Sequence, residues 1–98
     1  MLKKQYYKGG NNCRVWFYLP PEVDADTAQL VGDFNDWDET ANPMKIRKDG
    51  TFYTAVTLEK GQAYQFRYLL DSERWENDWE ADAYAPNDEG TENSVVQV

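Results

Sequence analysis

The segment that decides the fold is CRVWFYL at residues 13–19. Apolar side chains occupy its odd-numbered positions, and polar or amphipathic side chains occupy the even-numbered ones. Successive side chains of a strand point to opposite faces, so this alternation predicts a strand that buries one face in a core. Two prolines follow and end the strand, because proline cannot donate to a β-ladder. The predicted core face carries Cys13, Val15, Phe17 and Leu19, and the opposite face carries Arg14, Trp16 and Tyr18.

Similar short runs continue along the chain, separated by turn residues at intervals of roughly 8–12 residues. The strongest hairpin signal is Asp49-Gly50, because both residue types tolerate a positive φ. No window keeps apolar residues at helical spacing between good caps. The pattern therefore predicts an all-β fold, an antiparallel β-sandwich of about seven strands. Further strands are expected at residues 28–32, 44–47, 52–58, 62–70 and 94–98.

The charge balance restricts the partners of this chain. Its 98 residues correspond to one domain, and its formal net charge is −8. Nucleic acids and anionic membranes attract clustered Lys and Arg, so an acidic chain argues against both, whereas a neutral sugar is indifferent to charge. The lone cysteine forms no intrachain disulfide, and no long apolar run near the N-terminus resembles a signal peptide or a membrane span. We therefore expect a cytoplasmic protein without nucleic-acid or membrane partners.

Two tryptophans lie in polar surroundings, which is typical of a sugar platform. Trp37 directly follows a predicted strand and Trp75 follows a predicted hairpin, and both are flanked by charged or amide residues. An indole ring covers the apolar C–H face of a sugar, while nearby amides and charged groups bond the hydroxyl rim. The alternative is that these rings cap the ends of the sandwich, since Trp is mostly buried on average.

The other large aromatic side chains have more ordinary expected roles. Trp16 is expected to pack under Tyr6 and Tyr7, the alternative being a surface aromatic that meets a partner. Trp79 is expected to anchor the long polar stretch before the last strand, with extension of the sugar platform as the alternative. Phe34 is expected to plug the core.

Acidic residues crowd the last third of the chain without a recognisable catalytic pattern. A glycosidase needs two carboxylates about 5–10 Å apart across a cleft, and a thin sandwich has little room for one. We therefore expect a solvated acidic rim and no enzyme activity. The chain has neither a regular calcium loop nor any histidine, so no metal or cofactor is predicted, and Cys13 is expected in the core. The acidic residues are Asp71, Glu73, Glu76, Asp78, Glu80, Asp82, Asp88 and Glu89.

Three ordered segments resemble carbohydrate-binding module family 48, also called the isoamylase N-terminal or early-set domain. They are LVGDFNDW at residues 30–37, DGTF at 49–52 with YQFRYLLD at 64–71, and GTENSVVQV at 90–98. The resemblance covers residues 12–98 and implies an immunoglobulin-like early-set β-sandwich, with residues 1–11 as an N-terminal extension. The family includes domains of branching and debranching enzymes and the glycogen-binding domain of the AMP-activated kinase β subunit. This chain is most similar to its small stand-alone bacterial members.

The resemblance implies roles for individual residues. Trp37 and Trp75 match the two tryptophans that stack on glucose in glycogen-binding members. Arg67 stands where those members have a Lys that bonds sugar hydroxyls, which keeps the charge but changes its geometry. Thr91 and Asn93 match the Thr and Asn of the closing motif.

The function implied by this resemblance is non-catalytic binding of an α-1,4-glucan such as glycogen, starch or maltodextrin. One departure is Glu89, which replaces a Leu that reaches into the ring of glucose units in glycogen-binding members. Many members attached to enzymes keep the fold and have lost the sugar site. The alternative is therefore a structural or docking module associated with an α-glucan-metabolising enzyme, through the face that carries Trp16 or through a free edge strand.

Overall fold

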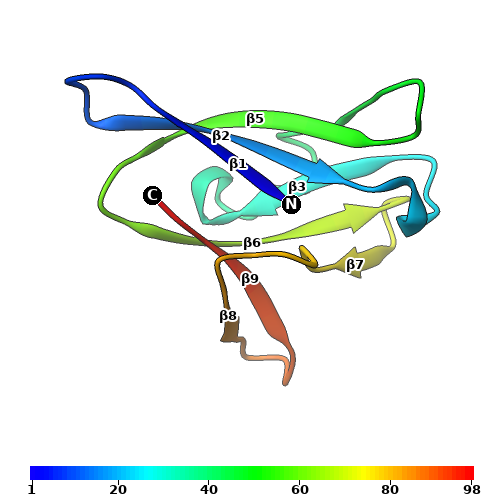
Figure 1. Ribbon diagram of the computed structural model, residues 1–98. Helices are drawn as coiled ribbons and strands as arrows, with labels where there is room; N and C mark the ends of the chain where they lie inside the picture. Colours follow the sequence, from blue (N-terminus) through cyan, green and yellow to red (C-terminus); the bar gives the residue numbers. More distant parts are fainter.

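Two antiparallel β-sheets face each other in the computed structural model, which describes residues 1–98 (Figure 1). The first sheet has the strand order β1-β2-β5-β4, and the second has the order β3-β6-β9-β8 with β7 paired to β6. The prediction of an all-β sandwich is therefore confirmed. The strands are β1 (Leu2–Tyr6), β2 (Asn12–Leu19), β3 (Ala28–Gly32), β4 (Lys45–Ile46), β5 (Phe52–Glu59), β6 (Ala63–Leu70), β7 (Arg74–Glu76), β8 (Ala83–Pro86) and β9 (Glu92–Gln97), with short 3₁₀ helices η1 (Pro21–Val23) and η2 (Asp33–Asn35).

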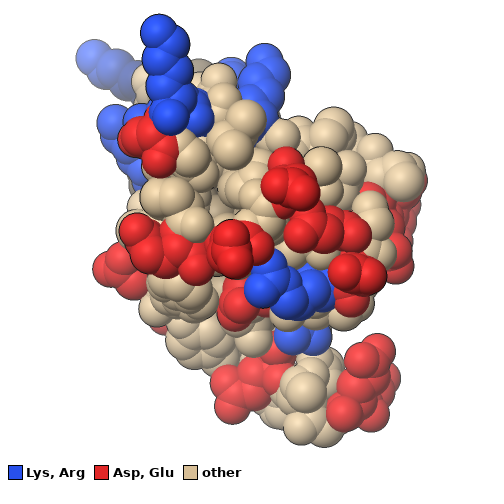
Figure 2. Space-filling view, turned by 90° about the vertical axis from the view of Figure 1, so that its right-hand side faces the viewer, with Lys and Arg blue, Asp and Glu red and all other residues tan.

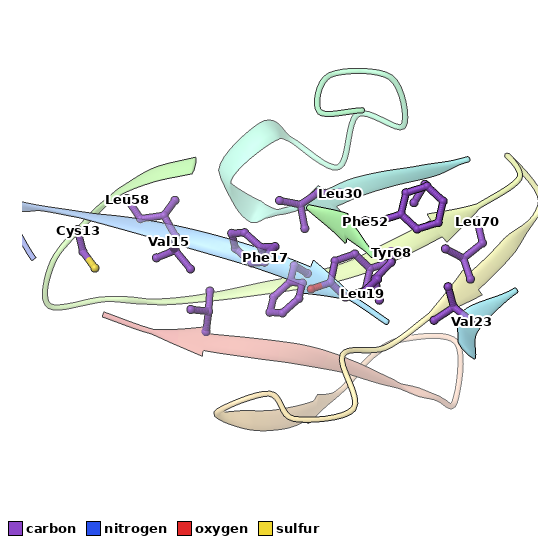
Figure 3. Packing of buried hydrophobic residues seen from close by; sticks show 13 residues of the cluster. Cys13, Val15, Phe17, Leu19, Val23, Leu30, Phe52, Leu58, Tyr68 and Leu70 are labelled. Carbon is purple, nitrogen blue, oxygen red and sulfur yellow. The ribbon is translucent and has the colours of Figure 1, made fainter. Parts of the chain in front are cut away.

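Side-chain alternation along β2 and β6 fills the space between the two sheets. The predicted core face of β2 is buried, Cys13 included, and its opposite face is half-buried. From the other sheet, β6 contributes Phe66, Tyr68 and Leu70, all fully buried. Phe17 meets Phe66 edge to face, with ring centroids 5.1 Å apart, which is a favoured geometry for aromatic pairs. Figure 3 shows this cluster enclosed between the sheets.

The structure contains more strands than the sequence pattern indicates. β1 lies within the first eleven residues and pairs with β2 along its whole length. β7 and β8 lie in the polar stretch before the last predicted strand, where they pair with β6 and β9. All three are short edge strands that are largely exposed, so their side chains carry little of the alternation that marks a half-buried strand.

The expected packing of Trp16 against Tyr6 is absent. In the register of β1 with β2, Tyr6 lies opposite Cys13, on the core side, whereas Trp16 lies opposite Lys3. Directly opposed residues of paired strands share one face of the sheet, so the two rings point to opposite faces. Trp16 instead lies beside Arg14, whose guanidinium carbon is 5.0 Å from the centre of the indole ring.

Asp78 is an exception to the predicted acidic rim, because it is only 1% exposed. Its Oδ2 accepts a 2.7 Å hydrogen bond from the Tyr68 hydroxyl and also contacts the N-terminal ammonium group of Met1. Its Oδ1 accepts from the Glu80 backbone N–H, and its own N–H donates to Ser94 Oγ, both at 2.8 Å. A buried carboxylate needs such partners, and these bonds fix the turn after β7 to β6 and β9.

Burial has a direct effect on the Tyr68 hydroxyl. The pKa of Tyr68 is raised well above its ordinary value of 10.0. The largest cause is the removal of the hydroxyl from solvent, and the negative charge of Asp78 and the hydrogen bond to it act in the same direction. Folding therefore disfavours ionisation of this tyrosine. The associated stability is fully present below pH 10.0, where the unfolded tyrosine is neutral, and is lost as the pH rises further.

We predict that Tyr68→Phe lowers the free energy of unfolding by about 1–3 kcal/mol, because Asp78 loses a hydrogen-bond donor in a buried site. Urea unfolding monitored by circular dichroism measures this change. Tyr6→Phe, which removes an exposed hydroxyl, is the matched control and should leave stability unchanged. In the wild type, stability should fall more steeply above pH 10.0 than in Tyr68→Phe. Equal stability of the two variants at neutral pH would contradict this account.

Candidate functional site

A pocket of about 270 Å³ lies on the outer face of the second sheet. Because Phe66 and Tyr68 of β6 face the core, the intervening Arg67 faces outward. β6 is paired with β3 on one side and with β9 and then β7 on the other, so side chains from several segments meet above it. The residues that line the pocket are Trp37, Arg67, Trp75, Asn87, Asp88, Glu89 and Asn93.

Trp37 reaches the pocket from a tight turn that follows β3 and η2. Asp36 and Trp37 both adopt left-handed backbone conformations, with φ of 56° and 57°. The Asp33 carboxylate bridges this turn to β6: Oδ1 accepts from the Trp37 indole N–H at 2.9 Å, and Oδ2 accepts from the Gln65 backbone N–H at 2.8 Å. The half-buried indole ring is therefore held in one orientation by a single carboxylate.

The GDFN part of the same segment, residues 32–35, anchors this turn to β3. Asn35 Oδ1 accepts from the Gly32 N–H at 3.0 Å, and its amide donates to the Leu30 carbonyl at 3.0 Å. A Cβ atom at Gly32 would lie 2.6 Å from the Gln65 carbonyl oxygen, so only glycine permits this close approach of the two strands. Phe34 packs against the core, with its ring centroid 5.7 Å from that of Phe17, and this prediction is confirmed.

Trp75 lies in β7 rather than in a loop, opposite Leu69 of β6. It is 39% exposed, and the Arg67 guanidinium carbon lies 5.9 Å from the centre of its ring. Its neighbour Arg74 fixes β7 by donating to the carbonyl oxygens of Val23 and Asp24 at 2.8 and 2.9 Å. The second tryptophan is thus carried by a short strand that is anchored to the connection between β2 and β3.

Arg67 has no carboxylate within ion-pairing distance, although Asp88 and Glu89 line the same pocket. Its Nε is shielded from solvent and has no hydrogen-bond partner. A buried unsatisfied donor is unfavourable for folding, and its burial also keeps this Nε out of reach of a molecule in the pocket. The terminal N–H groups of Arg67 are therefore the donors that this side chain can offer in the pocket.

Asn87 organises the turn between β8 and β9, and the sequence analysis missed it. Its Oδ1 accepts from the backbone N–H groups of Glu89 and Thr91 at 3.0 and 3.1 Å, and its amide donates to Asn93 Oδ1 at 3.0 Å. Asn93 in turn donates to Gln65 Oε1 at 3.0 Å. The only available signal was the turn composition of PNDEG at residues 86–90.

The structure brings four of the five predicted site residues to the lining of one pocket, namely Trp37, Trp75, Arg67 and Asn93. Thr91 is not among the lining residues. Its hydroxyl is instead engaged by the Asn87 side chain, at 2.8 Å from the amide nitrogen and 3.1 Å from the carbonyl oxygen.

The pocket is slightly acidic, with one arginine and two carboxylates. Both carboxylates come from consecutive positions of one exposed turn, Asp88 and Glu89, so they do not face each other across a cleft. Figure 2 shows acidic side chains on a projection at the lower end of the molecule.

No three His, Cys, Asp or Glu side chains are grouped as metal ligands. None of the helical segments is long and apolar enough to cross a membrane.

The fold and the pocket together define an immunoglobulin-like β-sandwich with an open pocket, lined by two tryptophans, on one sheet. Residues 3–85 match a protein family that is described as Carbohydrate-binding module 48 (Isoamylase N-terminal domain). The chain belongs to this family of binding modules, which confirms the resemblance seen in the sequence.

The curated relatives are far longer than this chain. It is 33% identical over 69 residues to the 1,4-alpha-glucan branching enzyme GlgB of Aquifex aeolicus (strain VF5), which covers 69% of the chain and 11% of the enzyme. It is 32% identical over 70 residues to the 1,4-alpha-glucan branching enzyme GlgB of Butyrivibrio fibrisolvens, which covers 71% of the chain and 11% of that enzyme. The similarity therefore concerns one small part of each enzyme.

We predict that Asp33→Ala releases the Trp37 ring, because its indole N–H loses its acceptor. In a ¹H–¹⁵N spectrum, the Trp37 indole signal should shift, and the Gln65 amide should exchange with solvent faster than in the wild type. The Trp79 indole, which meets Glu76 at 3.4 Å and does not line the pocket, is the internal reference and should stay unchanged. An unperturbed Trp37 signal would show that other contacts hold the ring.

Proposed function

We propose that this chain binds α-glucan chains without catalysing their conversion, in the pocket on the outer face of the second sheet. The observation that carries the proposal is the presence of two accessible tryptophan rings, Trp37 and Trp75, in one pocket with an unpaired Arg67. If both rings were buried at the ends of the sandwich, a docking role would be favoured instead. Membership of a carbohydrate-binding family and similarity to proteins named as α-glucan branching enzymes support the same ligand class.

The proposed mechanism uses the two chemical faces of glucose separately. The indole rings of Trp37 and Trp75 cover apolar C–H surfaces of the sugar units, and burial of this surface favours binding. Arg67 donates hydrogen bonds to sugar hydroxyls, and the carboxamide of Asn93 uses its remaining donor and acceptor capacity on the hydroxyl rim, whereas the Asn87 carboxamide is fully engaged within the chain and serves to position Asn93. An open pocket has few enclosed contacts, so the expected dissociation constants range from about micromolar to millimolar.

The proposal assigns no catalytic step to this chain. Asp88 and Glu89 are adjacent, exposed and on one side of the pocket, whereas glycoside hydrolysis uses carboxylates on both sides of the scissile bond. The activity named for the two relatives belongs to proteins of which this chain matches 11%. An α-glucan-metabolising enzyme as a partner, a cytoplasmic location and a sugar-bonding role for Thr91 stay predictions.

We predict that Trp37→Ala and Trp75→Ala each weaken maltoheptaose binding by roughly tenfold or more, since each ring contributes on the order of 1–2 kcal/mol of apolar burial. Titration of intrinsic tryptophan fluorescence measures the effect, with cellohexaose as the sugar control. Trp16→Ala is the matched protein control, because this ring lies on the other sheet. If both pocket variants bind maltoheptaose as the wild type does, the site assignment is wrong.

We further predict that Glu89→Leu tightens maltoheptaose binding by roughly three- to tenfold. The change replaces a charge that must lose water on binding by an apolar side chain that adds contact with the sugar. Isothermal titration calorimetry gives the dissociation constants. Glu89→Gln separates the two contributions, because it removes the charge and adds no apolar surface. Weaker binding of Glu89→Leu than of the wild type would show that the carboxylate itself bonds the sugar.

A further inference from the structure

The outer face of the first sheet carries a second group of aromatic side chains, mixed with cations. Arg14, Trp16 and Tyr18 of β2 face away from the core, because the intervening residues are buried. Trp16 lies opposite Lys3 of β1, and Tyr53 of β5 lies opposite both Tyr18 and Lys45. The same strands contribute a single outward carboxylate, Glu59, at the far end of β5. This face is therefore basic in a chain whose net charge is −8.

Arg14 and a further cation, Arg47 in the segment after β4, lie over aromatic rings of this face. The Arg14 guanidinium carbon lies 5.0 Å from the centre of the Trp16 ring. The Arg47 guanidinium carbon lies 5.2 Å from the Tyr18 ring and 5.8 Å from the Tyr53 ring. A guanidinium group that rests on a ring keeps its N–H edge free for carboxylate oxygens, and it has little side-chain freedom left to lose on binding.

No carboxylate lies within ion-pairing distance of these cations, although Asp49 is close enough to Arg47 to interact with its charge. Asp and Glu outnumber Lys and Arg by 18 to 10, yet the ion pairs join only Met1 to Asp78 and Lys4 to Asp82. The Nε of Arg14 is shielded from solvent and has no hydrogen-bond partner, so only the terminal N–H groups of this side chain can reach an external ligand. Figure 2 shows Lys and Arg side chains projecting at the upper end of the molecule, where the first sheet lies in Figure 1. The charges of this face are thus free to meet an external anion.

We propose that this face docks an extended acidic segment of a protein partner. Arg14 and Tyr18, on which Arg47 rests, are four positions apart on β2, so their Cα atoms are about 13 Å apart. Cationic groups spread along a strand in this way match carboxylates about four residues apart on an extended segment better than they match one small anion. Trp, Tyr and Arg are also the side chains that dominate the binding energy at protein interfaces. A depression of about 250 Å³, lined in part by Arg14, Trp16, Lys45 and Tyr53, provides the central contact.

Charge and position favour this occupant over the alternatives. A nucleic acid carries charge along its whole length and is repelled by the net charge of −8, whereas a short acidic segment meets mainly the local face. A second copy of the chain carries the same net charge and is repelled as a whole. The face belongs to the sheet opposite the sugar pocket, so both surfaces are available at once. The domain would then connect an acidic protein to an α-glucan.

The test uses ¹⁵N-labelled protein and a synthetic peptide with glutamate at every fourth position and serine between. A peptide of the same composition with contiguous glutamates, an oligothymidylate and a dilution series of the protein alone are the comparison arms. The spaced peptide should shift the amide signals of residues 14–18 and 53–57 and bind several-fold tighter than the contiguous one. Arg14→Gln combined with Arg47→Gln should abolish these shifts and leave maltoheptaose binding unchanged. The double variant Lys8→Gln and Lys60→Gln, which removes equal charge at two turns, should bind the peptide as the wild type does.

Four outcomes would overturn the proposal. They are absence of shifts, equal binding of the two peptides, tighter binding of oligothymidylate at the same residues, and concentration-dependent shifts at this face without any added ligand. Equal loss in the two double variants would also contradict it, because the effect would then depend on total charge alone. If Trp37→Ala loses sugar binding but still binds the peptide, this proposal stands. The experiment therefore tests sugar binding in the pocket and peptide docking on the first sheet independently.

Discussion

The two-residue period of the β-strand is the constraint on which the rest of this structure depends. In β2 and β6, every second side chain must enter the core, and Phe17, Phe66 and Tyr68 fill it from both sheets. The intervening side chains are then forced outward, Arg14 and Trp16 on one sheet and Arg67 on the other. The same alternation that builds the core also presents the polar and aromatic residues, so folding itself places the side chains of both proposed binding surfaces.

Local hydrogen bonding turns this general pattern into a specific pocket. Asp33 fixes the Trp37 ring and β6 together, and Asn87 fixes the turn that carries Glu89. The close approach of Gly32 to β6 leaves no room for a side chain. These short polar residues satisfy backbone groups that the sheets leave free, and Asp33 also fixes the orientation of the Trp37 ring.

The sequence predicts best what alternation and turn chemistry control directly. The core face of β2, the burial of Cys13 and the core position of Phe34 follow from neighbouring residues alone. The edge strands β1, β7 and β8 escaped prediction because pairing with a neighbour, and not burial, defines them. The burial of Asp78 was equally invisible, since it depends on Tyr68 and Ser94, which are distant along the chain.

The same distinction applies to the candidate site. Trp37, Trp75, Arg67 and Asn93 could be named from the sequence, but their shared pocket depends on the pairing of β6 with β7 and β9. Asn87 carried only a turn signal, and its link to Asn93 arises from the β8–β9 hairpin. The basic face around Trp16 is recognisable as a charge pattern only when the register of four strands is known.

The most direct test of the central claim is an isotope-filtered NMR measurement of the domain saturated with maltoheptaose. It detects protons of the sugar that lie close to protons of the protein. We expect contacts from glucose C–H groups to the indole rings of Trp37 and Trp75, and none to Trp16. Contacts confined to any other surface, or none in a saturated complex, would contradict the assignment of this pocket as the α-glucan site.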